Sequence, residues 1–377
     1  MVSHSRSLYH SIGLTLLLAI ETIATAVFFI VSTYITNSWG WRWWYKFFTI
    51  ANGFVLLLSF FLVAETDFDR PEDATTGEVH LHFNKQGDVE KDGEQEILVR
   101  VTTAHGNVLQ PERFGERTWK HDLKLVTLKP RWHLILPFYR DFLQGLCIPS
   151  MIWLLLLNGA FLGLYVFQAG TFASVLIPPP YGFSFNSLGY VQAGQIVDCL
   201  IFLPLLGYGS DFVIKALSKR NKGLFKPEYR LIGISIPATV GVVCAIIYGQ
   251  SAQCAADTLK HQPTGHSWHW SAVVISYTGD FFAFLGANLV GLTYAIESFP
   301  NRAASMLAVI CVGRGFISFG LSYATLPSIS AIGYDGAMNV QGGIAGGLAL
   351  MAIPVYLTGH KIRGLAAKWF GMGADLA

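Results

Sequence analysis

The sequence predicts an all-α polytopic membrane protein with about eight transmembrane helices, and two observations lead to this prediction. Hydrophobic residues make up 52% of the 377 residues and charged residues only 13%, with a mean hydropathy of +0.44. A soluble globule of this length needs more polar residues to cover its surface. The apolar residues also form runs long enough to cross a lipid bilayer, with Lys and Arg gathered in particular loops.

The first two spans are expected at about residues 8–35 and 47–63. The segment NSWGWRWWYKF between them is an aromatic belt of the kind found at a membrane surface, and Gly40 allows the tight turn. Glu21 lies near the middle of the first span, where an ionisable group is costly unless it faces a cavity or a partner. Residues 1–64 therefore form a two-helix hairpin with its tip outside.

Residues 65–145 change abruptly to acidic, basic and Gly-containing sequence, which predicts a partly disordered cytoplasmic linker. The stretches VHLHF and EILVRVTT alternate in polarity. The alternative to disorder is that these two stretches pair as short strands. The end of the linker mixes basic and aromatic residues, a pattern suited to lying on the cytoplasmic membrane face. Residues 146–377 form the third region, a bundle of six spans.

The third and fourth spans are expected at about residues 146–177 and 188–206. Gln195 and Asp198 are three residues apart on the fourth span and therefore share one stripe of the helix. This stripe faces either a transport pathway or a neighbouring helix, and hydrogen bonding between helices is the commoner role of membrane amides. Hydrogen bonding between helices is a weaker explanation for Asp198, because a carboxylate inside the membrane demands a stronger reason than an amide does.

The segment from residue 207 to residue 231 concentrates basic residues between two nearly uncharged runs, which predicts a cytoplasmic loop. Gly207 and Gly209 are expected to let helix ends approach closely, and Asp211 follows where the helix leaves the lipid. The remaining spans are expected at about residues 231–250, 268–298 and 303–324, followed by a last span that contains GGIAGG at residues 342–347.

Asp280 and Arg314 are the intramembrane charges of two consecutive helices, and Asn288 lies on the same span as Asp280. The two charges are expected at comparable depth, so an ion pair between them is a reasonable hypothesis. Two interpretations of such a pair stay open. In a solvated cavity it exchanges with substrate or proton, and in a dry core it is a structural clamp.

The order Gly207, three residues, Asp211 and a basic run resembles the cytoplasmic-loop signature of the major facilitator superfamily. The segments RNKGLFKPEYRL, ESFPNRAASMLAVICVGRGFISFGLSYA and IPVYLTGHKIRG resemble its fungal drug:proton-antiporter-like branch. This resemblance implies alternating access by two rocking bundles, a coupling proton and efflux of a small amphipathic organic compound or secondary metabolite. It also implies a conformational latch at the inner gate, formed by Gly207, Asp211, Lys215, Arg220 and Arg230. The physical candidates for the substrate and proton pathway are Glu21, Gln195, Asp198, Asp280, Asn288 and Arg314.

In this family the tryptophan-rich turn joins the fifth and sixth of twelve helices, so the first four helices are expected to be absent from this partial major facilitator fold. The alternative to a working transporter is a truncated, non-transporting membrane protein or a subunit that needs a partner chain. We find no hydrolase, P-loop, zinc-protease or dinucleotide-binding motif, so no enzyme, cofactor or metal site is predicted. A net charge of +2 argues against a nucleic-acid partner. The plasma membrane is the expected location, with a vacuolar or other endomembrane as the alternative.

Overall fold

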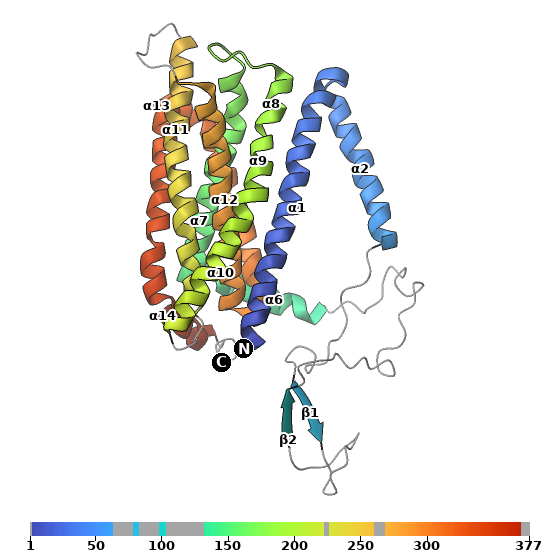
Figure 1. Ribbon diagram of the computed structural model, residues 1–377, viewed down its shortest axis with the longest axis vertical. Coiled ribbons are helices and arrows are strands. Elements are labelled where there is room, and N and C mark those ends of the chain that lie inside the picture. Colours follow the sequence, from blue (N-terminus) through green and yellow to red (C-terminus); the bar gives the residue numbers. More distant parts are fainter. Residues whose placement is uncertain are drawn as a thin grey trace. The chain divides into compact units, whose positions relative to one another are not determined.

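The computed structural model describes residues 2–62, 78–82, 98–102, 132–221, 226–259 and 268–370. The chain divides into two compact units, one made of Met1–Trp44 with Trp132–Ala377 and the other of Tyr45–Arg131. In the first unit, long helices run side by side along a common direction (Figure 1). This division differs from the predicted one, because the first helix groups with the C-terminal helices.

The smaller unit holds most of α2 (Trp41–Leu62) and a pair of strands. Strand β1 (Glu78–His82) pairs antiparallel with β2 (Leu98–Thr102), with Val79 opposite Val101. The alternating segments of the linker therefore form the short strand pair that the sequence offers as an alternative. The prediction of partial disorder concerns residues that lie outside the described ranges.

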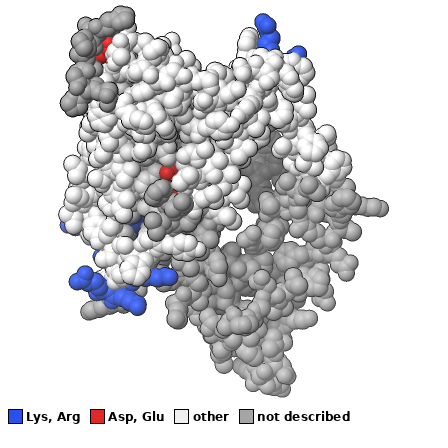
Figure 2. Space-filling model, turned by 45° about the horizontal axis from the view of Figure 1, so that its top comes forward, with Lys and Arg blue, Asp and Glu red and all other residues white. Residues whose placement is uncertain are grey.

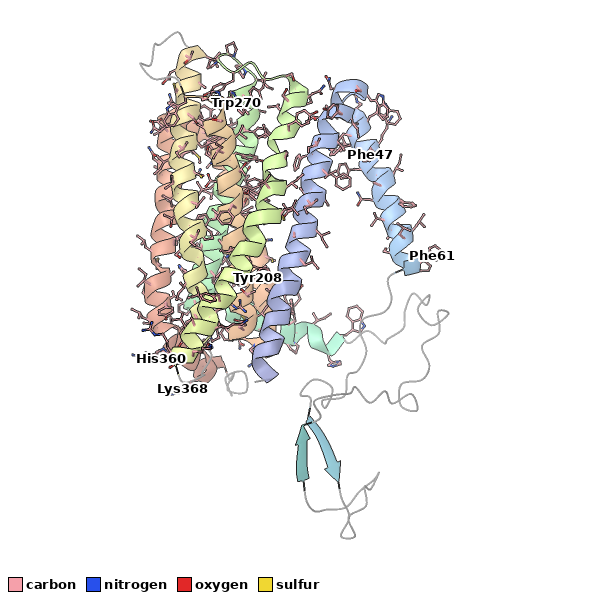
Figure 3. The ribbon with its side chains drawn as sticks, viewed as in Figure 1. Phe47, Phe61, Tyr208, Trp270, His360 and Lys368 are labelled. Carbon is pink, nitrogen blue, oxygen red and sulfur yellow. The ribbon has the colours of Figure 1, made fainter. Side chains whose placement is uncertain are left out.

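The larger unit consists, in its described part, of helices and the turns that join them (Figure 3). Its long helices are α1 (Val2–Trp39), α7 (Pro149–Leu176), α10 (Leu203–Arg220), α11 (Ser235–Leu259), α12 (Trp270–Ser298), α13 (Ala303–Leu350) and α14 (Ala352–Phe370). Its shorter elements are η1 (Trp132–Leu134), α6 (Ile135–Leu146), α8 (Phe185–Val191), α9 (Ala193–Val197), the π-helix η2 (Asp198–Phe202) and the 3₁₀ helices η3 (Pro227–Ile234) and η4 (Pro300–Arg302).

Helix α13 is two helices joined at Gly333, whose φ of 76° and ψ of 176° break the helical path. Met306, near its start, packs against Gly145, at the end of α6. Leu348, near its end, accepts a hydrogen bond of 2.8 Å from Nε1 of Trp153, which lies one turn into α7. Since Gly145 and Trp153 lie on either side of the junction between α6 and α7, both ends of α13 meet this junction, and the chain reverses at Gly333. A left-handed φ at a reversal of this kind favours glycine.

The fourth span is broken rather than continuous. The sequence predicts one helix over residues 188–206, whereas the structure places α8, α9 and the π-helix η2 in succession before α10. A π-helix inserts extra residues per turn and therefore rotates the side chains on its two sides relative to one another. The π-helix begins at Asp198, so it rotates the side chains that follow it relative to Gln195 and the residues before it.

The basic segment after this span is largely helical, so the predicted extent of the cytoplasmic loop is wrong. Helix α10 continues to Arg220, and η3 begins at Pro227. Lys219 and Arg220 lie in the last turn of α10, where cations stabilise the helix dipole. The expected close packing at Gly209 is also wrong, because a side chain there would meet nothing within 4 Å. Positive charge identifies the side of the membrane but does not end a helix.

Helix α7 is the centre of the bundle and contacts both α12 and the first half of α13. A Cβ atom added at Gly159 would lie 2.8 Å from Cβ of Ile317, so glycine is required for this close approach. The second half of α13 packs on α11 through Gly342 and Gly346, while Gly343 and Gly347 meet no atom. Only half of the GGIAGG glycines therefore serve the helix packing that the sequence predicts.

The described helices account for eight membrane spans. Six helices are long and apolar enough to cross a bilayer, and they include α1, α2 and α13. Because α13 reverses at Gly333, it provides two spans, and the broken α8–α10 segment provides another. Figure 2 shows a wall almost without charged side chains, with the basic ones at its ends. The chain is therefore an integral multi-pass membrane protein of all-α fold.

Candidate functional site

Four aromatic rings from α7 and α12 form a stack that we term the aromatic ladder: Phe172, Tyr277, Tyr165 and Phe284. Consecutive ring centroids are 5.2, 5.6 and 6.2 Å apart. The two residues from each helix are seven apart and therefore lie on one helical face, two turns from one another. Tyr277 is fully buried, whereas the other three rings are half-buried. The ladder thus offers an aromatic edge that is accessible to a solute.

Glutamine side chains from the broken fourth span hold the middle of the ladder. Nε2 of Gln195 lies 2.5 Å from Oε1 of Gln192, 3.0 Å from the hydroxyl of Tyr165 and 3.1 Å from the hydroxyl of Tyr277. The hydroxyl of Tyr277 also donates to Oε1 of Gln192 over 3.2 Å. These contacts join three helices, which is the interhelical role that the sequence analysis gives as the commoner one for a membrane amide.

Arg314, on the first half of α13, lies at the Phe284 end of the ladder. Its Nη1 donates a hydrogen bond of 2.5 Å to Oδ1 of Asn288, and its Cζ lies 5.8 Å from the centroid of the Phe284 ring. The guanidinium group is half-buried. A guanidinium within about 6 Å of a ring centroid is attracted by the face of the ring, so Arg314 is held beside the ladder.

Asp280 does not pair with Arg314, and the hypothesis of an ion pair between them is wrong. Oδ2 of Asp280 accepts a hydrogen bond from Nε2 of Gln168, and both side chains are buried. Oδ1 of Asp280 and Oε1 of Gln168 have no partner among the described residues. The carboxyl group therefore has incomplete hydrogen bonding inside the bundle, an arrangement that is costly and often functional in a membrane.

The other two candidate carboxylates take no part in the hydrogen bond between Asp280 and Gln168. Glu21 is exposed on α1, whose neighbouring Thr22 and Ala26 are buried. Ala19 and Ile23 of the same helix pack on an apolar cluster that includes Phe281. Asp198 is buried and lines a groove between α10, α11 and α12, away from the ladder.

The proposed latch residues differ in their environments. Lys215 and Arg220 are exposed along the second half of α10, and we call this side of the bundle the basic end. Gly207 is half-buried near the start of α10, and the side chain of Asp211 lies outside the described residues. Arg230 differs from the exposed cations, because it is 3% exposed and belongs to the bundle core.

Three ion pairs tie helices together at the basic end. Nε and Nη2 of Arg230 both lie 2.5 Å from the carboxylate of Glu297, a bidentate pair between η3 and α12. Nη2 of Arg363 on α14 lies 2.7 Å from Oε1 of Glu228. Nη1 of Arg302 lies 2.7 Å from Oδ1 of Asp141 on α6. Bidentate arginine pairs fix geometry as well as charge, so this end of the bundle is rigidly braced.

Sequence reasoning missed the aromatic ladder and the partners of Asp280 and Arg314. The ladder had a usable signal, since aromatic residues recur seven apart on α7 and at positions 277, 281 and 284 of α12. The pairing of Gln168 with Asp280 had no such signal, because this pairing depends on which face of α7 meets α12.

Fold and site together define a polytopic helical membrane protein with a polar and aromatic surface inside its bundle. The family model described as Major Facilitator Superfamily matches residues 8–323. The chain belongs to this superfamily, which consists of transporters rather than enzymes.

Several curated fungal proteins are similar to the chain at low identity. Protein HOL1 of Saccharomyces cerevisiae is 20% identical, covering 97% of this chain and 68% of its own length. MFS-type transporter atr4 of Stereocaulon alpinum is 26% identical over 88% of this chain and 51% of its own length. MFS-type transporter penM of Penicillium rubens is 29% identical over 57% of this chain and 40% of its own length. The chain thus spans about two thirds of the first relative and about half or less of the other two. No solved structure matches the chain.

Proposed function

We propose that the chain acts in secondary active transport, exporting a small amphipathic organic compound in exchange for protons by alternating access. The observation that carries this proposal is the aromatic ladder, whose half-buried edge ends at the guanidinium of Arg314. Stacked rings bind the apolar part of an amphipathic molecule without demanding one shape, and the cation with Asn288 orients a polar group.

The coupling proton is assigned in this proposal to Asp280. An intramembrane carboxyl with one donor and one unpartnered oxygen suits reversible protonation, because a proton supplies the missing hydrogen bond. Asp280 lies on α12 one residue from Phe281, whose ring centroid is 5.0 Å from that of Tyr165. Protonation of Asp280 therefore acts on the helix that carries half of the ladder. Glu21 is the second candidate carrier.

The basic end takes the role of the inner gate in this proposal. Lys215 and Arg220 are exposed on α10 and free to contact a neighbouring bundle or the membrane surface. The core pair of Arg230 with Glu297 serves a different purpose, since it keeps η3 and α12 moving as one body. Gly207 and Asp211 belong to the same helix and complete the predicted latch.

The test is flux through liposomes that contain the purified chain, with a pH gradient and a panel of amphipathic fluorescent compounds. We expect gradient-dependent flux that an Asp280→Asn variant abolishes. Asp257→Asn is the matched control, because Asp257 lies at the end of α11 and accepts from its own helix neighbour Gln253. Absence of flux for every compound, with folded and inserted protein, would overturn the proposal.

A second candidate function is that the chain works only together with a partner chain. Glu21 favours it, because this carboxylate is exposed in the middle of α1 and no described side chain donates to it. A membrane carboxylate in this position requires polar surroundings that a further helix supplies. Copurification of a second membrane protein, together with flux only when both are present, would support this candidate over the first.

A further inference from the structure

An apolar groove of about 770 Å³ lies on the outer side of the bundle, between α9, α10, η3, α11 and α12. Apolar side chains on its rim are open to the surroundings: Val197, Ile232, Ile236 and Ile275 are between 38% and 66% exposed. The groove therefore opens sideways, toward lipid. Its volume lies within the range of pockets that bind small organic molecules.

One charged residue, Asp198, reaches this groove. Its side chain is 2% exposed, and Oδ2 has no hydrogen-bond partner among the described residues. The nearby hydroxyls do not supply one: Ser235 donates to the carbonyl of Ile232 and Thr278 donates to that of Val274. A buried polar atom without a partner is expensive, and in a membrane the cost is larger still.

Asp198 faces the groove, whereas Gln195 of the same broken span faces the aromatic ladder. Gln195 is three residues earlier and points to Tyr165 and Tyr277 of the aromatic ladder. Asp198 instead follows Gly194 by four residues, in helical geometry that persists up to Asp198, and both residues line the groove. None of the ladder residues lines the groove. The two surfaces are therefore separate.

The depth of Asp198 restricts what can meet it. Asp198 is 13 residues after Phe185, the first residue of α8, which at 1.5 Å per residue places it about 20 Å below that helix end. The hydrocarbon core is about 30 Å thick, so Asp198 lies inside it, beyond the midplane as counted from the start of α8. A ligand for this carboxylate must carry its own charge into the apolar region.

We propose that this groove is a binding site for cationic amphiphiles, with Asp198 as the counter-ion of an ammonium group and the apolar walls holding its hydrocarbon part. Charge complementarity carries the assignment, because a single unpartnered carboxylate at the centre of an apolar groove matches one cation on an apolar scaffold. This site goes beyond the proposed function. It is detected by binding, whether or not the chain transports the bound molecule.

The test uses a dodecyltrimethylammonium probe that carries a diazirine at mid-chain, and a neutral isostere that ends in a tert-butyl group. Each is photolysed with the full chain in nanodiscs, and labelled peptides are mapped by mass spectrometry. We expect the cationic probe to label peptides containing Val197, Ile236 and Ile275 about tenfold more than the isostere does, which corresponds to one buried charge interaction of about 1.4 kcal/mol. Bulk partition works against this result, since the charged head prefers the membrane surface.

Two variants separate the carboxylate from the groove. Asp198→Asn removes the charge and is expected to bring labelling by the two probes to the same level. Val197→Trp fills the rim and is expected to reduce labelling by both probes. Asp257→Asn, a carboxylate on α11 outside the groove, is expected to leave labelling unchanged. Equal labelling by the two probes of the unsubstituted chain would overturn the proposal without any variant, as would charge selectivity that persists in folded Asp198→Asn protein.

Discussion

Gln168 on α7 donates a hydrogen bond to Asp280 on α12, and the two side chains are 0% and 1% exposed. The remaining oxygen of each side chain has no partner among the described residues. Each residue is thus the other's hydrogen-bond partner inside the bundle. Removing one partner leaves a buried polar group, whereas removing both leaves none.

Substitution of this pair should therefore be strongly non-additive. We expect Gln168→Leu to lower the free energy of unfolding by about 1–3 kcal/mol, because Asp280 loses its donor. The double variant Gln168→Leu with Asp280→Leu should lose less than the sum of the two single losses. Unfolding by sodium dodecyl sulfate, followed by circular dichroism, measures all four proteins of the cycle.

A second amide on α7 provides the control for that cycle. Asn158 is also fully buried, but its Nδ2 bonds the carbonyl of Leu154 on its own helix. Asn158→Leu should therefore show no coupling to Asp280→Leu. Coupling of similar size at Asn158 and Gln168 would contradict the pairing.

Arg314 should affect ligand binding more than folding, because it is half-buried at the accessible end of the ladder. Arg314→Gln removes the cation over Phe284 and the charged donor to Asn288. We expect the apparent affinity for an anionic or hydroxyl-bearing amphiphile to fall about tenfold, equivalent to about 1.4 kcal/mol. Concentration-dependent flux measures this, and an unchanged melting temperature excludes misfolding. A large loss of thermal stability with unchanged affinity would mean that Arg314 is a structural brace.

Two glycines of α7 should respond in opposite ways to the same substitution. Gly159→Ala places a Cβ 2.8 Å from that of Ile317, whereas Gly170→Ala meets nothing within 4 Å. We expect the first to destabilise the bundle by about 1–3 kcal/mol through overpacking. The second should be neutral or stabilising by up to about 1 kcal/mol, since alanine is the better helix former. Equal effects at the two positions would contradict the close contact between α7 and α13.

The number and order of the spans were predictable because each span needs an apolar run long enough to cross the bilayer. Apolar runs of the required length mark α7 and α12 almost to the residue. The reversal at Gly333 was also predictable, because the sequence separates the spans before and after it. The ends of α10 and α11 were not, since a helix continues into water whenever its polar residues favour helix.

The partners inside the bundle could not be predicted, because they depend on helix rotation and offset. Asp280 and Arg314 lie at comparable fractions of their spans, yet Arg314 meets Asn288, which is eight residues beyond Asp280. Eight residues of helix are about 12 Å, so an error of two turns in relative offset changes the partner. The π-helix at Asp198 adds a rotation that no hydrophobic period encodes.

The pair of Arg230 with Glu297 leads to the last prediction. Both carboxylate oxygens lie 2.5 Å from guanidinium nitrogens, and the two side chains are 4% and 13% exposed. Lysine has one charged atom and cannot reproduce this fork, so Arg230→Lys should destabilise the bundle although it keeps the charge. Breaking a buried pair costs about 3–5 kcal/mol, and Arg230→Ala should approach that loss.

Lys215→Ala is the control, because Lys215 is exposed on α10 and its loss should change the free energy of unfolding by less than about 0.5 kcal/mol. A loss for Arg230→Lys no larger than that of the control would show that the charge alone, and not the bidentate geometry, braces η3 against α12.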